Sequence, residues 1–377
     1  MNDLFFELIQ VSLGKQICLS HTPTVDEWRG LYEIAKKQSM VGICFAGVQR
    51  LQSQRQEPPE MTYLTWMGMA AKIQQRNETV NRQCVELQAK LSADGIRSSI
   101  LKGQGVGALY DKHLQYLRQS GDIDIYVDCG REKAIGYARK LQGDVDWDYK
   151  HVHLKVFQDP LTCSGEPTEV EMHYVPEVFL NLWKNRKLQK WFKEHEGQMF
   201  TQQNELMIPS VEFNLFYILL HTYRHFLYEG VGLRQLMDYF FVLHTVQTKK
   251  ANVSTVGTSG ACDSKVLEFQ DLLKGFGMMR FTKGVMWIMK SVFRLDARHV
   301  ICEPDEKEGY YILIKVMTGG NFGHHDERLM NNSKGKCSAI RKILKHNWHM
   351  LVHYPSDAIW APVWIVYHWC WKKLNRI

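Results

Sequence analysis

Residues 121–127 hold the side chains of this sequence that most directly imply chemistry. Their order, Gly-Asp-Ile-Asp-Ile-Tyr-Val, predicts a β-strand. Because side chains alternate along a strand, Asp122 and Asp124 would project from one face and the isoleucines from the other. Two adjacent carboxylates repel each other unless a positive group lies between them, and a divalent cation such as Mg²⁺ takes oxygen ligands and commonly holds substrate phosphates. The pattern points to metal-assisted phosphoryl or nucleotidyl transfer.

A third carboxylate is offered by a second alternating segment, residues 168–175. There, Glu171 shares the polar face of the predicted strand with Glu169 and His173. If the sheet brings Glu171 beside the aspartate pair, the three carboxylates complete a site for one or two divalent cations. Such metals neutralise phosphates, orient an attacking hydroxyl and stabilise the leaving pyrophosphate. Glu169 competes for this role, but its place at the entrance of the strand predicts a solvent-exposed side chain.

A glycine-bearing turn precedes the aspartate strand. Lys102, Gly103 and Gln104 fall where a predicted strand passes into a short helix, and backbone N–H groups at such a turn favour phosphate. Lys102 and Arg118 are candidates to clamp phosphates. Each is equally compatible with a surface charge or with a partner for the aspartates when no metal is bound.

The histidines offer a rival chemistry. His151, His153 and His173 lie on polar faces of predicted strands, whereas His221 and His225 lie four residues apart on a predicted helix. Such a set could hold zinc for hydrolysis. However, the segment around the helical pair lacks the glutamate of a zinc-protease helix. We therefore expect His153 and His173 to line a nucleotide site, and the helical pair to make polar contacts between a helical region and the sheet.

Hydrophobic periodicity predicts an α+β protein in which a small mixed β-sheet domain at residues 93–200 is flanked by helical regions at 1–92 and 201–377. Thr24 looks like the cap of one N-terminal helix, and a long helix is expected from about Met61 to Leu91. Strands are predicted at 96–101, 122–127, 149–157 and 168–175, helices at about 103–110 and 132–141, a linker at 248–262 and a break at 319–323.

Composition is that of a globular chain, with 377 residues, 45% hydrophobic and 23% charged residues, and a formal net charge of +7. Part of this charge lies at residues 334–345, which we interpret as a solvated basic face. Nine cysteines without a CxxC pair indicate reduced thiols, and no apolar run reaches the roughly 20 residues of a membrane span. With no signal-peptide pattern at the N-terminus, we expect a cytoplasmic protein whose tryptophan-rich C-terminus is a docked helix.

Three stretches together resemble a known family: Leu101-Lys102-Gly103, then Arg118 with Gly121-Asp122-Ile123-Asp124-Ile125, then Val170-Glu171-Met172-His173. They look like the DNA polymerase β-type nucleotidyltransferase superfamily, and its branch of poorly characterised bacterial nucleotidyltransferase-like proteins in particular. The resemblance implies that Gly103 lines a triphosphate, that Asp122 and Asp124 bind metal, and that Glu171 is the third acid. In the superfamily the turn glycine is usually followed by glycine or serine, where this chain has Gln104.

The function expected from the residues and the resemblance is transfer of a nucleoside monophosphate from an NTP to an acceptor hydroxyl, with Mg²⁺, or alternatively Mn²⁺, as cofactor. The acceptor is left open among a small molecule, a sugar, a protein and an RNA end, and neither stable membrane insertion nor DNA binding is expected. The alternative is a non-catalytic nucleotide- or partner-binding protein, a regulator or antitoxin-like partner, that keeps the fold. The predicted catalytic and metal-binding residues are Asp122, Asp124 and Glu171, and the predicted nucleotide-binding residues are Lys102, Gly103, Gln104, Arg118, His153 and His173.

Overall fold

A computed structural model describes residues 2–158, 167–253, 260–320 and 350–375 of the chain. The predicted basic stretch at 334–345 lies outside these residues. The fold is α+β, as expected, and combines many helices with one small mixed sheet. The chain divides into two compact units, each built from stretches that are distant in sequence. The first unit comprises Met1–Gln75, Leu109–Gln119 and Leu215–Asn332, and the second comprises Arg76–Ala108, Ser120–Asn214 and Ser333–Ile377.

The N-terminal part of the first unit follows the helices predicted from periodicity. Thr24 caps its helix through a capping box, in which its side chain accepts from the backbone N–H of Glu27 and the Glu27 carboxylate accepts from the backbone N–H of Thr24. The helix then buries Trp28, Leu31 and Ala35. The helices of this part are α1 (Asn2–Ser12), α2 (Val25–Lys37), α3 (Val41–Leu51) and the short η1 (Gln52–Gln54).

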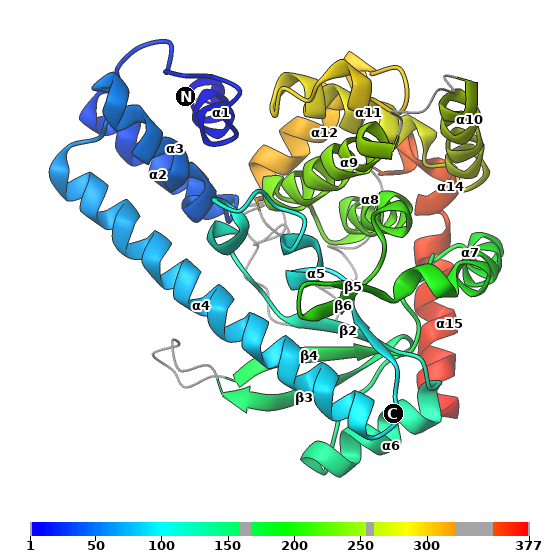
Figure 1. The fold of residues 1–377 in the computed structure, drawn as a ribbon. Coiled ribbons are helices and arrows are strands. Elements are labelled where there is room, and N and C mark those ends of the chain that lie inside the picture. The colour runs from blue at the N-terminus through cyan, green and yellow to red at the C-terminus, as the bar shows by residue number, and fades with distance from the viewer. Residues whose placement is uncertain (1, 159–166, 254–259, 321–349, 376–377) are drawn as a thin grey trace, which may run out of the picture. The chain divides into compact units, whose positions relative to one another are not determined.

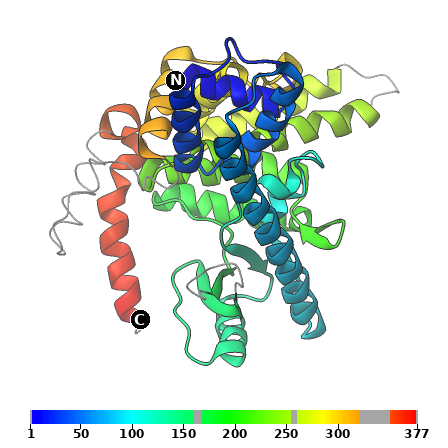
Figure 2. The same ribbon diagram turned by 90° about the vertical axis from the view of Figure 1, so that its left-hand side faces the viewer.

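The predicted long helix is present as α4, which runs over 34 residues from Glu60 to Ala93. Its C-terminal half belongs to the second unit, where Val80, Cys84, Leu87 and Leu91 are buried in the core of that unit. Their spacing of three to four residues places them on one face of the helix. Both ribbon views show this half of the helix beside the sheet (Figure 1 and Figure 2).

All four predicted strands are present, and they form one sheet in the second unit. The strand order is β1-β2-β4-β3; β2 and β4 run parallel, whereas the β1–β2 and β3–β4 pairs are antiparallel. The sheet is therefore mixed, as predicted. The strands are β1 (Ser98–Ile100), β2 (Ile123–Val127), β3 (His151–Gln158) and β4 (Pro167–His173).

One face of this sheet is apolar and closed off by helices. Ile123, Ile125, Val170 and Met172 are each at most 1% exposed, and they share a core with α4 and with α6 (Arg131–Gln142). Because successive side chains of a strand point to opposite faces, burial of these residues directs the side chains between them to the other face. The alternation that predicted the strands thus also fixes which residues can form a polar site.

The remaining elements complete the two units. The second unit adds α5 (Gln104–Gly107), α7 (Leu182–Glu194), η3 (Glu196–Met199), the β5–β6 hairpin (Thr201–Gln203 and Leu206–Ile208), α14 (Pro355–Ala358) and α15 (Trp360–Leu374). The first unit adds η2 (Gln115–Leu117), most of α8 (Val211–Tyr228), α9 (Leu233–Val253), α10 (Gly260–Gly275), α11 (Met279–Ser291), η4 (Ala297–His299) and α12 (Glu306–Gly319). The linker predicted at 248–262 is partly wrong, because α9 continues to Val253 and α10 begins at Gly260.

The C-terminal helix α15 is docked, as expected from its tryptophans. Trp364 and Trp371 pack edge-on against Tyr149, and His368 pairs with Asp148. These contacts attach the helix to the segment that leads into β3. Among the described residues, no helix is long and apolar enough to cross a membrane.

Gly105 determines how closely α5 packs against β1. A Cβ atom at this position would lie 2.3 Å from the carbonyl oxygen of Ile100, far inside contact distance. We expect Gly105→Ala to destabilise the protein by about 1–3 kcal/mol, because backbone must move to relieve the clash. The measurement is chemical unfolding of the variant beside the unchanged protein.

The matched control for this substitution is Gly136→Ala, on helix α6. No atom lies within 4 Å of the position that its Cβ would occupy. This second variant should be neutral or up to about 1 kcal/mol more stable, because alanine favours helix over glycine. Equal stability changes in the two variants would contradict the proposed close packing.

Candidate metal and nucleotide site

The sheet register brings the predicted site residues together on its polar face. Asp124 of β2 lies directly opposite Glu171 of the parallel strand β4, and His153 of β3 lies opposite Glu171 on its other side. Two residues further along the strands, His173 of β4 lies opposite Tyr126 of β2. His173 is therefore not in the same row as Asp124, Glu171 and His153. Neighbouring side chains on one face of a sheet lie close enough to interact, so this pairing accounts for the cluster.

Asp122, Asp124 and Glu171 form a carboxylate triad. One oxygen from each lies within 4.8 Å of the other two, which is the spacing of groups that can share a cation. Asp122 is exposed, Asp124 is buried, and the Glu171 side chain is 21% exposed. The donor set consists of oxygens only, as hard divalent cations prefer. Glu169, the competitor for the third position, is 60% exposed and faces Lys155 instead.

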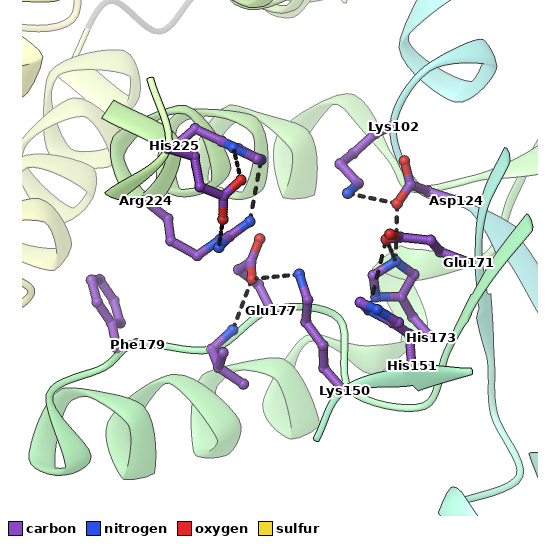
Figure 3. Close-up of polar contacts among 12 residues, drawn as sticks. Lys102, Asp124, Lys150, His151, Glu171, His173, Glu177, Phe179, Arg224 and His225 are labelled. Atoms are coloured by element: carbon purple, nitrogen blue, oxygen red, sulfur yellow. Dashed lines mark hydrogen bonds and ion pairs between the residues drawn. The ribbon is translucent and has the colours of Figure 1, made fainter. Parts of the chain in front are cut away.

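Two nitrogen-bearing side chains contact the triad (Figure 3). The Lys102 ammonium lies 2.6 Å from Oδ1 of Asp124, and Nε2 of His173 lies 2.9 Å from the same oxygen. The same Nε2 lies 3.2 Å from Oε2 of Glu171. All these groups are largely buried, so their mutual attraction is little screened by water. Lys102 and His173 thus partly compensate the negative charge that the carboxylates bring together.

The electrostatic environment separates the pKa values of the two aspartates. The charge of Asp124, and to a lesser extent partial desolvation of the Asp122 carboxyl group, raise the pKa of Asp122 to about 6. Burial alone would raise the pKa of Asp124, but Lys102 and the hydrogen bond from His173 outweigh it and lower that pKa to about 2. The pKa of Glu171 also lies below its ordinary value, because its interactions with His173 and Lys102 outweigh the cost of burial.

Two histidines of β3, His151 and His153, extend the cluster. His151 lies opposite His173 in the antiparallel pair, and its Nδ1 lies 3.7 Å from Oε2 of Glu171. Its Nε2 lies 3.0 Å from Nε2 of His153. Burial, and then the nearby His173, lower the pKa of His151 to about 3, so its ring is neutral at physiological pH. The sequence suggested His151 only as a member of a possible zinc set, and not as a catalytic or nucleotide-binding residue. The strand alternation places His151 on the same face as His153. Which residue His151 contacts across the sheet, however, depends on the register of β3 and β4.

The glycine turn has the backbone conformation that only glycine adopts readily. Gly103 has φ 51° and ψ −108°, and it lies at the start of α5, a helix of four residues. The Gln104 side chain is buried and donates to Oδ1 of Asn77 and of Asn81, at 3.2 and 2.7 Å. In this arrangement the Gln104 amide fastens the turn to helix α4. Its predicted contact with a nucleotide stays a prediction.

Arg118 belongs to the first unit, where it forms a buried ion pair. Its Nε and Nη2 atoms donate to the two carboxylate oxygens of Asp238 at 2.6 and 2.7 Å, and Tyr110 donates to Oδ1 of the same carboxylate. Arg234 lies four residues before Asp238 on the same helix, and it donates to the carbonyl of Gln119. Arg118 thus has a structural role, because it binds both carboxylate oxygens of Asp238. Its predicted contact with a phosphate stays a prediction.

The other predicted residues that share the second unit do converge. The structure places Lys102, Asp122, Asp124, Glu171 and His173 in one cluster, with His153 beside it through His151. In the first unit, His225 pairs with Glu229 at 2.7 Å, and its ring packs against that of His221.

A small mixed sheet with carboxylates from two parallel strands on its polar face is the arrangement of a nucleotidyltransferase-like protein. A family model described as an uncharacterised nucleotidyltransferase matches residues 24–255, more than half of the chain. The chain therefore belongs to this uncharacterised nucleotidyltransferase family. The resemblance predicted from the sequence is confirmed at the level of the nucleotidyltransferase-like family.

Other comparisons add little. No curated protein matches the sequence. The crystal structure of an antigenic nucleotidyltransferase-like protein from Paracoccidioides brasiliensis is similar, with 14% sequence identity and a TM-score of 0.31, over 45% of this chain and 77% of that one.

The raised pKa of Asp122 predicts a pH-dependent gain in stability for Asp122→Asn. Its folded-state pKa of about 6 exceeds the ordinary value of 3.8, so ionising it costs stability as the pH rises through 6. In metal-free solution we expect the variant to be more stable by about 1 kcal/mol above pH 7, a size limited by the exposure of Asp122 to solvent. Below about pH 4 the difference should vanish, because both side chains are then neutral.

Thermal unfolding of both proteins in chelator, from pH 3 to pH 8, measures this effect. Glu169→Gln is the matched control, because it removes a carboxylate from the polar face of β4 at a site that faces Lys155. A stabilisation by Asp122→Asn that is the same at pH 3 and pH 8 would contradict the assigned repulsion.

Arg118→Ala tests the structural role of the buried ion pair. The Arg118 and Asp238 side chains are only 5% and 9% exposed, so removing the arginine leaves a buried carboxylate without its counter-ion. We expect a loss of about 3–5 kcal/mol in the free energy of unfolding, measured with denaturant. Arg29→Ala breaks an exposed arginine–aspartate pair and should cost less than about 1 kcal/mol. If both variants were equally stable, the pair would not hold the first unit together.

Proposed function

We propose that this protein is a nucleotidyltransferase that uses a divalent metal to transfer a nucleoside monophosphate from an NTP to an acceptor hydroxyl, releasing pyrophosphate. The observation that carries the proposal is the convergence of Asp122, Asp124 and Glu171 on one face of the sheet, with ligand atoms within 4.8 Å. Membership of the nucleotidyltransferase family supports the same reading. In this proposal the three carboxylates are both the metal-binding and the catalytic residues.

The donor chemistry of the triad fits the proposed metal, Mg²⁺ with Mn²⁺ as the alternative. It offers three carboxylates and one exposed ligand, Asp122, so substrate oxygens and water have room to complete the coordination. The mutual repulsion that raises the pKa of Asp122 is relieved when a cation is bound. When bound, the metal supplies neutralisation of the phosphate charge and of the departing pyrophosphate.

Lys102 and Gly103 are the proposed contacts of the triphosphate. The Lys102 ammonium already lies 2.6 Å from Asp124, and a flexible lysine side chain can turn from a carboxylate to a nearby phosphate. Gly103 lies beside the backbone of Asp122: a Cβ atom placed on Gly103 would be 3.6 Å from the carbonyl oxygen of Asp122. Because glycine has no side chain, a phosphate can approach its backbone N–H closely. The other residues proposed to contact the nucleotide are His153, His173, Gln104 and Arg118.

Proton removal from the acceptor hydroxyl is assigned to whichever carboxylate of the triad faces it. A carboxylate is a competent general base when it lies within hydrogen-bond reach of the proton. The acceptor itself is a small molecule, a sugar, a protein or an RNA end. The labelled product of the reaction identifies which.

The double variant Asp122→Asn with Asp124→Asn tests the assignment. We expect metal-dependent NTP turnover to fall by at least about a hundredfold, because several kcal/mol of charge stabilisation are lost. The assay incubates the purified chain with each labelled NTP, Mg²⁺ or Mn²⁺ and a cell extract, and follows pyrophosphate and the labelled acceptor. Unchanged turnover in the double variant would reject the site.

Glu169→Gln is the matched control for this assay. It removes an exposed carboxylate from β4, two positions before Glu171, and should leave turnover unchanged. Nucleotide binding by the unchanged protein, without metal-dependent release of pyrophosphate under any condition, would instead support the alternative of a non-catalytic nucleotide- or partner-binding protein.

A further inference from the structure

We propose that His151, Glu171 and His173 form a second metal site, which takes a borderline transition-metal cation of the Zn²⁺ class. One ligand atom from each of these residues lies within 4.8 Å of the other two. The site adjoins the carboxylate triad and shares Glu171 with it. It is complete without nucleotide and therefore does not depend on the proposed transfer reaction.

The separations between the ligand atoms fit a common ion. Nδ1 of His151 and Nε2 of His173 lie 3.7 and 3.2 Å from the same oxygen, Oε2 of Glu171. Ligands about 2.0–2.2 Å from a tetrahedral zinc ion are about 3.3–3.6 Å apart, so the observed distances bracket the expected one. The 3.7 Å distance is too long for a direct hydrogen bond. A cation bound by all three residues would fill this gap.

The lone pair of His151 is directed to the site by its neighbour. Nε2 of His151 lies 3.0 Å from Nε2 of His153. With the proton on its Nε2, His151 donates to His153 and presents an unprotonated Nδ1 towards Glu171. Metal-ligating histidines are commonly oriented in this way, through a hydrogen bond from the ring nitrogen that does not bind the metal. His153 is thus assigned as a positioning residue for the second site.

The second observation that points to a bound ligand is that ring nitrogens of His151 and His173 are buried without a hydrogen-bond partner among the described residues. His151 is 8% exposed and His173 is fully buried. The Nδ1 atoms of both rings are buried and have no hydrogen-bond partner among the described residues. A buried polar atom without a partner costs free energy, so such atoms call for an explanation. Coordination by a cation supplies one for Nδ1 of His151.

The backbone holds the ligands in place. His151 and His173 are directly paired across the β3–β4 ladder, and Glu171 precedes His173 by two residues on the same face. The rings of His151 and His173 are 5.0 Å apart and strongly tilted (Figure 3). Ligands that project from paired strands need little reorganisation to bind. The site is therefore preformed.

Donor type separates this site from the triad beside it. Two imidazoles and one carboxylate suit zinc and other later transition metals, whereas an all-carboxylate set suits Mg²⁺ or Mn²⁺. When no metal is bound, Nε2 of His173 donates a hydrogen bond to Asp124 at 2.9 Å. A bound cation would replace that hydrogen bond. With three protein ligands, the site keeps one coordination position open.

The test is calorimetric titration of the full chain with Zn²⁺, after removal of metals by chelator and in excess Mg²⁺ without nucleotide. We expect one tight Zn²⁺ site in the unchanged protein. His151→Ala should weaken binding by at least about a hundredfold, and His153→Ala by about tenfold, as for a residue that orients a ligand. Circular dichroism verifies that each variant is folded, and His151→Asn is the substitute if the alanine variant does not fold.

Two further variants serve as controls. His21→Ala removes an exposed histidine of the first unit, which contacts Ser20 and Glu27, and should not affect Zn²⁺ binding. Asp122→Asn should weaken Mg²⁺-dependent turnover but not Zn²⁺ binding, so the two sites can fail separately. The absorption spectrum of bound Co²⁺ provides a readout of nitrogen ligation that activity does not give.

Three outcomes would overturn the proposal. The first is a lack of Zn²⁺ binding by the unchanged protein. The second is equal binding by His151→Ala and His21→Ala. The third is a loss of Zn²⁺ binding in Asp122→Asn as large as that in His151→Ala, because the cation would then occupy the carboxylate triad.

Discussion

Electrostatic repulsion among Asp122, Asp124 and Glu171 is the constraint on which the site depends. These carboxylates approach within ligand distance on a sheet whose other face is a closed apolar core, so they cannot separate without breaking strand pairing. Lys102 and His173 provide the compensating contacts. This compensation is shared unequally between the two aspartates: the pKa of Asp122 is raised to about 6, whereas that of Asp124 is lowered to about 2. Rigidity and unrelieved charge together make this face suitable for binding a cation.

The elements of this sheet could be predicted because each leaves a local signal. Alternation of apolar and polar residues identified β2, β3 and β4, and it also showed that Asp124, Glu171 and His153 would leave the core face. The cap at Thr24 was equally local, since its partner Glu27 is three residues away. Because side-chain direction on a strand has a period of two, the composition of the polar face follows from sequence once the strands are known.

Pairings between distant segments could not be predicted in the same way. Nothing local specifies that Asp238 meets Arg118, which is 120 residues away, rather than an arginine on its own helix. His151 was named only as a member of a possible zinc set and was left out of the predicted nucleotide site for the same reason, since its approach to Glu171 depends on the antiparallel register of β3 and β4. The linker prediction was partly wrong because Lys249, Lys250 and Ala251 have high helix propensity, and α9 extends to Val253.

The parallel pairing of β2 with β4 also affects the order of events during folding. Asp124 and His173 are 49 residues apart, and α6 and β3 lie between their strands. Closing so long a loop lowers the entropy of the chain before the contacts between the strands can form. Contacts between residues so far apart in sequence therefore slow folding. The nascent chain therefore carries its acidic residues far apart and hydrated, and the ligand set exists only once the crossover has been completed. The proposed metal site is in this sense a property of the finished topology, and no fragment that ends before residue 171 can form it.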